Sequence, residues 1–269
     1  MSSNYDLTFV TGTLTIDRAK VEITSIDPNA VRTEPKAASA PVDNFTIKLD
    51  PSIAWSQVKI DVTLTPVAGG GSITRSGLVP VSGVFDLGSI PLGCYDIAVT
   101  VNAPNYYSDP YYDAFSVYDP TLGFATGGGW FYWPDETQDK TTFGFVTNYG
   151  KKGANFKGSL ILVRHTEDGI YRIKSNALSG LSITSGSGYG TVSFSGKATY
   201  TDLSLETTGN YSFAMYAEDW NEPGSGNDFF WVRVKNGTVS ADGLYISETA
   251  KDNLQQVVHG NIAIPHNAR

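Results

Sequence analysis

The chain has 269 residues and a formal net charge of −8, with 41% hydrophobic and 17% charged residues. This length accommodates one large domain or two ordinary domains, each with its own hydrophobic core. The acidic balance, without a cluster of Lys and Arg, argues against nucleic acid as a partner. Glycine, tyrosine and phenylalanine are abundant, with 28, 15 and 13 residues, and this composition favours strands and turns over long helices.

The cysteine count and the hydropathy of the sequence exclude several kinds of site and any membrane-spanning segment. Cys94 is the only cysteine in the sequence, which rules out an internal disulfide and a zinc site built on several cysteines. Its surroundings, GCYDIAV, have the pattern of a strand, so we expect a buried thiol. No stretch is long and apolar enough to cross a bilayer, and residues 1–20 lack the pattern of a signal peptide. We expect no membrane insertion and, if the protein is exported, a monomeric piece of a longer chain.

The first 120 residues have the pattern of short strands. Residues 5–26 alternate apolar and polar side chains, which is the period of half-buried strands. Residues 27–42 are rich in Pro, Ala and Ser and predict an extended linker. Residues 43–120 predict an Ig-like antiparallel sandwich, which ends where Pro120 blocks continuation of a strand ladder. Its expected strands are 44–49, 57–65, 83–86, 95–101 and 114–118.

Residues 121–269 predict a second, larger β unit. Gly-containing turns at residues 166–169, 185–188 and 235–238 separate strand patterns as hairpins do. One segment, residues 247–257, has the pattern of a short helix. A β-sandwich or jelly-roll-like domain fits this length without crossover helices. The expected strands are 129–133, 141–149, 157–165, 170–178, 180–184, 190–200, 209–218, 229–235, 244–246 and 260–264.

Several segments resemble bacterial surface proteins. NYDLTFVTGTLTI, at residues 4–16, resembles the closing strand of the Ig-like repeat called MBG, so that residues 1–26 would be terminal strands left from a preceding repeat. IPLGCYDIAVTVNAPNYYS and FSVYDP make residues 43–120 similar to Ig-like repeats of such proteins. GFATGGGWFYWP, FGFVTNYGKKG and HGNIAIPH resemble a module that follows such repeats near the ends of long secreted proteins. The resemblance implies an extracellular or cell-surface location and brings no established activity with it.

An acidic loop is the first candidate site. Residues 218–228 contain four carboxylates, two side-chain amides and two glycines, and Ca²⁺ takes about six to eight oxygen ligands. The spacing is not that of an EF-hand. The two interpretations are a polar turn between strands, where these residue types are ordinary, and a calcium site. The residues that would bind the metal are Asp219, Asn221, Glu222, Asn227 and Asp228.

Aromatic side chains are the second candidate. Every residue from Trp130 to Trp133 is aromatic, so both faces of that strand carry rings. One face must belong to the core, whereas exposed rings on the other face could stack on sugar rings in a carbohydrate-binding module. The candidate ligand-binding residues are Trp130, Tyr132, Trp133, Trp220 and Trp231.

No motif in the sequence indicates catalysis. The three histidines, His165, His259 and His266, occur in no known catalytic spacing. Pairs of carboxylates are unavoidable in an acidic protein and need a cleft to act on glycosides. We therefore expect a non-catalytic structural or adhesive module of a bacterial surface protein. The alternatives are a carbohydrate-binding module and a polysaccharide hydrolase, and the expected partner is a polysaccharide or a host or cell-surface ligand.

Overall fold

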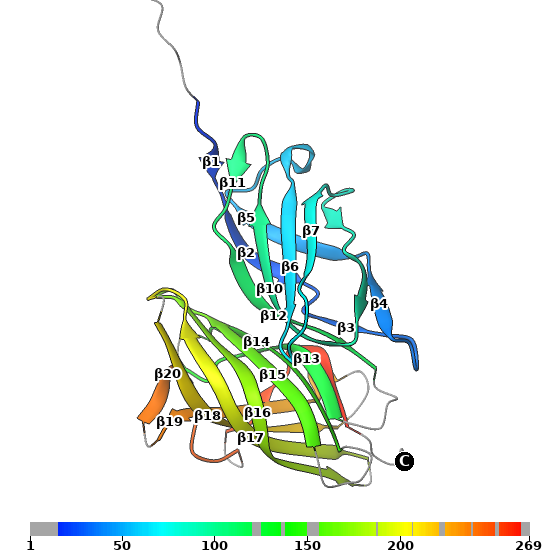
Figure 1. The fold of residues 1–269 in the computed structure, drawn as a ribbon, viewed down its shortest axis with the longest axis vertical. Helices are drawn as coiled ribbons and strands as arrows, with labels where there is room; N and C mark the ends of the chain where they lie inside the picture. Colours follow the sequence, from blue (N-terminus) through cyan, green and yellow to red (C-terminus); the bar gives the residue numbers. More distant parts are fainter. Residues whose placement is uncertain are drawn as a thin grey trace, which may run out of the picture.

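The computed structural model describes residues 16–119, 125–135, 138–149, 156–186, 188–205, 207–220, 224–237, 239–250 and 253–264 of the chain. Across these residues the secondary structure consists of strands and one short 3-10 turn, η1 (Trp55–Gln57), and no α-helix occurs among them. The predicted all-β fold is therefore confirmed. Figure 1 shows two units, with the N-terminal part of the sequence in the upper one and the C-terminal part in the lower one.

The first unit consists of two layers of strands around one core. One layer is a five-stranded sheet in the order β3 (Ala30–Arg32), β12 (Tyr111–Tyr118), β10 (Gly93–Val101), β6 (Ile60–Pro66) and β7 (Ile73–Leu78). The other contains β2 (Glu22–Asp27), β5 (Phe45–Asp50) and β8 (Val84–Phe85), and the pair β4 (Ser39–Val42) with β9 (Gly88–Pro91). A short parallel pair joins β1 (Ala19–Lys20) to β11 (Tyr106–Tyr107).

Strand periodicity explains how this core forms. Along β6 the side chains of Ile60, Val62 and Leu64 are fully buried, and the residues between them are only partly buried. Phe45 and Phe85 of the facing layer are also fully buried in the same cluster. Each such side chain contributes about 1.5–3 kcal/mol when it leaves water.

The predicted linker at residues 27–42 is wrong. β3 pairs in parallel with β12, and β4 pairs with β9, so this stretch forms part of the first unit. β2, which the sequence placed in a preceding repeat, pairs with β5. The error arose because a short edge strand such as β4 buries only two side chains, Ala40 and Val42, which is too few to show as periodicity. The rest of the proposed preceding repeat, residues 1–15, lies outside the described residues.

The second unit is built on one ten-stranded sheet as far as the structure describes it. β21 (Gln255–Gln256) pairs with β19 (Phe229–Asn236) and lies beside the main path of the sheet. The other strands follow the order β20 (Val239–Tyr245), β19 (Phe229–Asn236), β18 (Thr207–Asp219), β17 (Gly190–Asp202), β16 (Ile170–Ser185), β15 (Phe156–His165), β14 (Lys140–Tyr149), β13 (Ala125–Tyr132) and β22 (His259–Ala263).

This sheet curves until strands from its two ends meet across one core (Figure 1). The ring of Phe230 on β19 lies 4.3 Å from that of Phe143 on β14 and 5.5 Å from that of Phe131 on β13, between ring centroids. The two facing layers of this unit therefore arise from a single sheet that folds over itself.

Most strands of the second unit match the sequence prediction, but β20 (Val239–Tyr245) begins before the predicted strand 244–246, and two segments differ in kind. Residues 170–178 and 180–184 form one strand, β16, because register shifts near Ser175 and Leu178 interrupt the periodicity without ending the ladder. The predicted helix at residues 247–257 is wrong, since the described residues of this segment contain only β21 and irregular structure. Ser247 and Glu248 hydrogen-bond to side chains on β19, and these contacts replace those of a helix.

Candidate functional site

The acidic loop uses its carboxylates to hold the last strand. Asp228 is fully buried, and its two oxygens accept hydrogen bonds from the backbone N–H of Ile262, at 2.7 Å, and of Trp220, at 3.2 Å. Asp219 is buried as well and accepts from the backbone N–H of Ile264 at 2.7 Å. Asn261, on β22, in turn accepts from the backbone N–H of Gly224 at 2.6 Å. These contacts attach β22 to the other end of the sheet.

The predicted calcium site is only partly visible. Asn221 and Glu222 lie outside the described residues, and Asn227 is exposed in a turn. Within the described ranges, no group of three or more His, Cys, Asp and Glu side chains is arranged to hold a metal ion. Asp219 and Asp228 bind backbone N–H groups, which is the structural role that their burial favours. The calcium interpretation remains a prediction.

The predicted aromatic residues do not form one platform. Trp133 and Trp231 are buried, each with 5% of its surface exposed. The guanidinium of Arg164 lies 4.5 Å from the Trp133 ring centroid, and the Trp231 Nε1 donates a hydrogen bond to Ser247 Oγ at 2.8 Å. Trp133 belongs to the core of the second unit, whereas Trp231 lies on the outer face of β19, where the segment that contains Ser247 covers most of it.

The other three aromatic residues face outward in two separate pairs. Trp130 and Tyr132 contact each other on β13, and Tyr132 is 48% exposed. Trp220, which is 41% exposed, stacks on Tyr189 with ring centroids 4.8 Å apart. Tyr189 did not figure in the sequence prediction, because its position opposite Trp220 depends on the pairing of β17 with β18.

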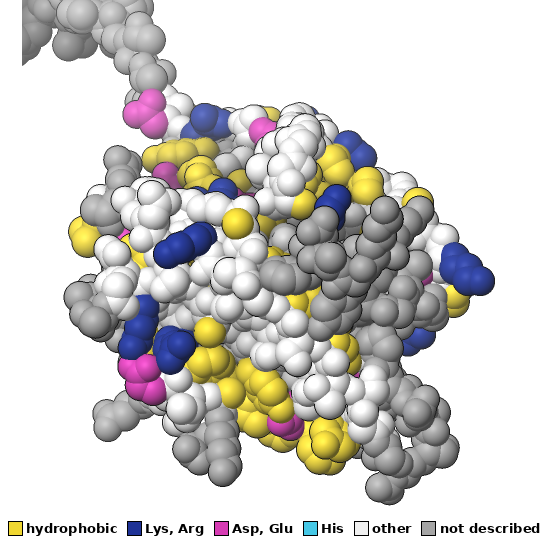
Figure 2. All heavy atoms as spheres, turned by 60° about the horizontal axis from the view of Figure 1, so that its bottom comes forward, with side chains coloured by type: hydrophobic (Ala, Val, Ile, Leu, Met, Phe, Trp, Pro, Cys, Tyr) yellow, Lys and Arg dark blue, Asp and Glu magenta, His cyan; other side chains and the backbone are white. Residues whose placement is uncertain are grey.

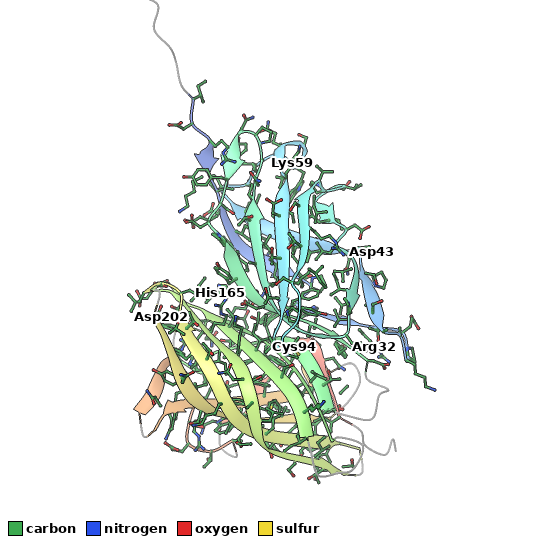
Figure 3. All side chains as sticks on the ribbon, viewed as in Figure 1. Arg32, Asp43, Lys59, Cys94, His165 and Asp202 are labelled. Atoms are coloured by element: carbon green, nitrogen blue, oxygen red, sulfur yellow. The ribbon has the colours of Figure 1, made fainter. Side chains whose placement is uncertain are left out.

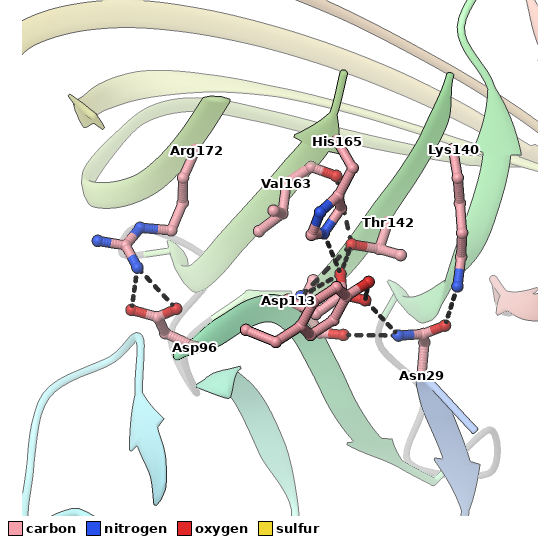
Figure 4. A network of polar contacts seen from close by, with 10 residues as sticks. Asn29, Asp96, Asp113, Lys140, Thr142, Val163, His165 and Arg172 are labelled. Atoms are coloured by element: carbon pink, nitrogen blue, oxygen red, sulfur yellow. Dashed lines mark hydrogen bonds and ion pairs between the residues drawn. The ribbon is translucent and has the colours of Figure 1, made fainter. Parts of the chain in front are cut away.

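The most unusual polar cluster lies where the two units meet (Figure 4). Asp113, on β12 of the first unit, is fully buried. Its carboxylate accepts a hydrogen bond from Asn29 Nδ2 at 3.0 Å and a short one from the hydroxyl of Thr142 on β14. His165 Nε2 lies 3.8 Å from the same carboxylate, and Lys140 Nζ donates to Asn29 Oδ1 at 3.1 Å. The cluster thus joins side chains of both units.

The charge of Asp113 is stabilised by this surrounding. Burial alone would raise the pKa of Asp113, but the neighbouring His165, Lys140 and Thr142 outweigh it and lower that pKa below its ordinary value. The Tyr111 ring stacks on the imidazole of His165 at 4.7 Å, and burial beside Asp113 raises the pKa of Tyr111 well above its ordinary value. We refer to Asn29, Asp113, Lys140, Thr142 and His165 as the junction cluster.

A second ion pair lies beside the junction cluster. Asp96 on β10 is 8% exposed and accepts from Arg172 Nη1 and Lys174 Nζ, both at 3.0 Å, on β16 of the second unit. A buried carboxylate of this kind requires its partners, since removing one leaves an uncompensated charge. The sequence signal for Asp96 and Asp113 is a lone aspartate within an otherwise apolar strand, which indicates a buried charge with a distant partner.

Apolar contacts complete the junction. Cys94 and Ala114 of the first unit pack with Ile161 and Val163 of the second, and Figure 3 places Cys94 at the level where the units meet. Burial raises the pKa of the Cys94 thiol to about 12, as expected for an unreactive structural cysteine. The predicted buried thiol is confirmed.

One glycine sets how closely the units approach. A Cβ atom on Gly128 of β13 would lie 1.8 Å from Ser116 Oγ and 2.9 Å from Ser116 Cβ on β12. Ser116 itself is 1% exposed. Only a residue without a side chain allows the backbone of β13 to contact β12 in this way.

The junction cluster has the residue types of a catalytic site but not its accessibility. His165, Asp113 and a hydroxyl are present, yet Asp113 is enclosed and Thr142 bonds to the carboxylate instead of the imidazole. A nucleophile needs its base within hydrogen-bond reach and a path for the substrate. The cluster therefore serves to join the two units.

Comparison of the chain with protein-family models, curated proteins and solved structures gives no match. Within the part of the chain that the structure describes, no helix has the length and apolar character needed to span a membrane.

The first prediction concerns the attachment of β22. Asp228→Asn leaves one acceptor oxygen where two backbone N–H groups need one each, so one buried donor loses its partner. We expect the free energy of unfolding to fall by about 1–3 kcal/mol, measured by urea denaturation at neutral pH. Asp168→Asn, in an exposed turn, is the matched control and should change stability by less than about 0.5 kcal/mol. Wild-type stability of Asp228→Asn would contradict the role given to this carboxylate.

The second prediction concerns the close approach at Gly128. Gly128→Ala should reduce the free energy of unfolding by about 1–3 kcal/mol because the new methyl group overlaps Ser116. Ser116→Gly removes both overlapping atoms, so the double variant should recover part of the loss, and a double-mutant cycle measures the coupling. Gly71→Ala is the control, since a Cβ there meets nothing within 4 Å. Additive effects of the two changes would show that the strands are not in contact.

The third prediction concerns the charge of Asp113. Its pKa is lowered in the folded protein, so the ionised carboxylate stabilises the fold above the unfolded pKa, and this contribution is lost as the pH falls through the folded pKa. Asp113→Asn should cost about 1–3 kcal/mol near pH 5, and its difference from wild type should shrink towards about pH 3. Urea denaturation at both pH values measures this, with Asp43→Asn, an exposed site, as control. A difference that is independent of pH would contradict the assignment.

Proposed function

We propose that the chain is a non-catalytic structural module of an extracellular or cell-surface protein, in which the two β units act as one rigid body that supports adhesion. The observation that carries this proposal is the enclosed junction, where Asp113 is fully buried between the units and bonded from both. Units joined only by a linker move relative to one another unless their interface is large and well packed. Here the interface combines charge pairs, apolar contacts and the close contact of β13 with β12 that Gly128 allows.

Several features support the extracellular location and the Ig-like nature of the first unit. The chain is acidic and has one cysteine, which is buried and unreactive. The segments at residues 4–16, 43–120, 123–134, 143–153 and 259–266 resemble repeats and modules of bacterial surface proteins. A stalk or spacer in such a protein needs stable β domains that do not hinge against each other. The junction supplies this resistance to hinge motion.

Carbohydrate binding is a second candidate function. The observation that favours it is the exposed stack of Trp220 on Tyr189, since a fixed aromatic face is how proteins contact sugar rings. This candidate concerns the outer surface of the second unit and is compatible with a structural role of the junction.

Cys94 offers a direct test of rigidity. As the single cysteine in the chain, it lies 3% exposed in the junction, so a thiol reagent reaches it only when the units separate. We expect Ellman's reagent at mildly alkaline pH to label Cys94 no faster than the protein unfolds globally, with the same dependence on urea. Gly128→Ala should accelerate labelling about tenfold or more, because it weakens the junction.

Two results would contradict the proposed function. Rapid labelling of Cys94 in the native wild-type protein, without urea, would show that the units hinge apart. Turnover of a polysaccharide that is abolished by a single carboxylate substitution would show that the chain is an enzyme. Unfolded protein, in which Cys94 is free, provides the upper limit of the labelling rate.

A further inference from the structure

The outer face of the second unit carries a groove across strands β16 to β19. It consists of two hollows of about 460 Å³ and about 390 Å³, which meet at Ser195 and Ala214. Figure 2 turns the underside of the molecule forward; on the left of that view Lys and Arg side chains lie next to acidic ones, other Lys and Arg side chains lie on the right, and hydrophobic side chains lie at the lower edge. We call the two hollows together the outer groove.

Strand register explains why this face is hollow. Gly180 lies opposite Ser195, and Ser182 lies opposite Ser193, on β16 and β17. Ala214 of β18 lies opposite Ser195 from the other side. Because alternate residues share a face, five small residues meet over three strands, and larger side chains surround them. The serine hydroxyls give this floor both donors and acceptors.

A loop forms one wall of the outer groove. Residues 248–250 line the larger hollow. Ser247 accepts from Trp231 Nε1 at 2.8 Å, and Glu248 accepts from Arg233 Nη1 at 2.9 Å and from Lys235 Nζ at short range. The hydrogen bond from Lys235 is the main reason that the pKa of Glu248 is lowered to about 2, so these ion pairs persist at any ordinary pH. The wall is therefore held in place.

One end of the face carries ordered aromatic rings. The Tyr216 hydroxyl donates to one oxygen of Glu218 at 2.8 Å, and Trp220 Nε1 donates to the other at 2.6 Å. Trp220 also stacks on Tyr189. Burial and the neighbouring Glu218 raise the pKa of Tyr216 to about 12, so its ring stays neutral. Fixed rings contact a ligand at low entropic cost.

The other end is locally basic. Lys197, Arg233 and Lys235 line the smaller hollow, and Glu248 lies beside them in the larger one. The described side chains of the two hollows thus carry three positive charges and one negative, in a chain whose net charge is −8. A local excess of this sign attracts an anionic ligand against the overall charge of the protein.

From these observations we infer that the outer groove binds a linear polysaccharide that carries carboxylate groups, such as a uronic acid polymer. The face from the Tyr189–Trp220 pair to Lys197 spans eight residues of β17, or about 26 Å, which accommodates several sugar rings. The rings of Trp220 and Tyr216 would stack on sugars, the serines would bond their hydroxyls, and Lys197, Arg233 and Lys235 would bind carboxylates. This inference deepens the carbohydrate-binding candidate and is independent of the rigidity of the junction.

Isothermal titration calorimetry of the full chain at low ionic strength tests the inference. The probe is an oligogalacturonate long enough to span the face, with cellohexaose as the neutral counterpart. We expect the oligogalacturonate to bind more tightly, and its affinity to fall as NaCl is added. Lys197→Gln should raise Kd about fivefold, as expected for loss of one exposed charge contact. Trp220→Ala should raise it about tenfold through loss of an aromatic contact.

Matched variants separate this site from non-specific effects. Lys48→Gln and Trp55→Ala change an exposed lysine and a tryptophan of similar exposure, 38%, on the first unit, and both should leave Kd unchanged. Glu248→Gln removes the one carboxylate that competes for Arg233 and Lys235, so it should lower Kd. All variants should retain the slow labelling of Cys94 that reports an intact junction.

Four outcomes would overturn the inference. They are no saturable heat with oligogalacturonate, equal affinity for cellohexaose, wild-type affinity in both Lys197→Gln and Trp220→Ala, and tighter binding of an oligothymidylate of matching length, which would indicate a nucleic-acid site. If binding fails while Cys94 stays protected, only the groove assignment fails. If Cys94 is exposed while binding persists, only the structural role of the junction fails.

Discussion

The contact of β13 with β12 at Gly128 is the constraint on which the arrangement of the two units depends. It brings the backbone of the second unit against Ser116 of the first. At that separation the hydroxyl of Thr142 reaches Asp113, and Lys140 reaches Asn29. A larger residue at position 128 would move all of these groups apart, and Asp113 would keep its desolvation cost without its partners. The polar network is therefore a consequence of close packing.

Much of the fold could be predicted from local pattern. Strands such as 141–149, 157–165 and 229–235 have clear periodicity and turns of known chemistry, and the structure contains each of them within one or two residues. The edge strands β4 and β7 were missed because an edge strand buries few side chains, and β4 in addition owes its pairing to β9, far along the chain. The helix expected at residues 247–257 failed for a related reason, since Ser247 and Glu248 bond to β19.

The candidate sites were harder to predict, because the pleat of a strand separates neighbouring residues. Glu218 and Asp219 are adjacent in sequence and were considered as parts of one acidic loop. In the structure Asp219 points into the protein and holds the backbone of Ile264, whereas Glu218 points outward and holds Tyr216 and Trp220. Trp231 was considered as a ligand contact, but the loop bound to its indole covers it. Composition identifies such residue types, and only the register assigns them to a face.

The outer face of the second sheet is divided between two roles that its sequence pattern makes possible. Where the first unit covers β13 to β15, the outward residues are small or β-branched, such as Gly128, Thr142, Ile161 and Val163, and the strands are buried on both faces there. On β16 to β19 the outward residues are small hydroxyl-bearing side chains flanked by rings and cations, and the described part of the chain leaves them open. Small residues allow close approach to both parts of the sheet. On β13 they admit β12 of the first unit, and on β16 to β18 they leave the space of the outer groove. A module fixed to its neighbour through one part of a sheet can thus present the adjoining part in a constant orientation, which is the geometry that an adhesive role requires.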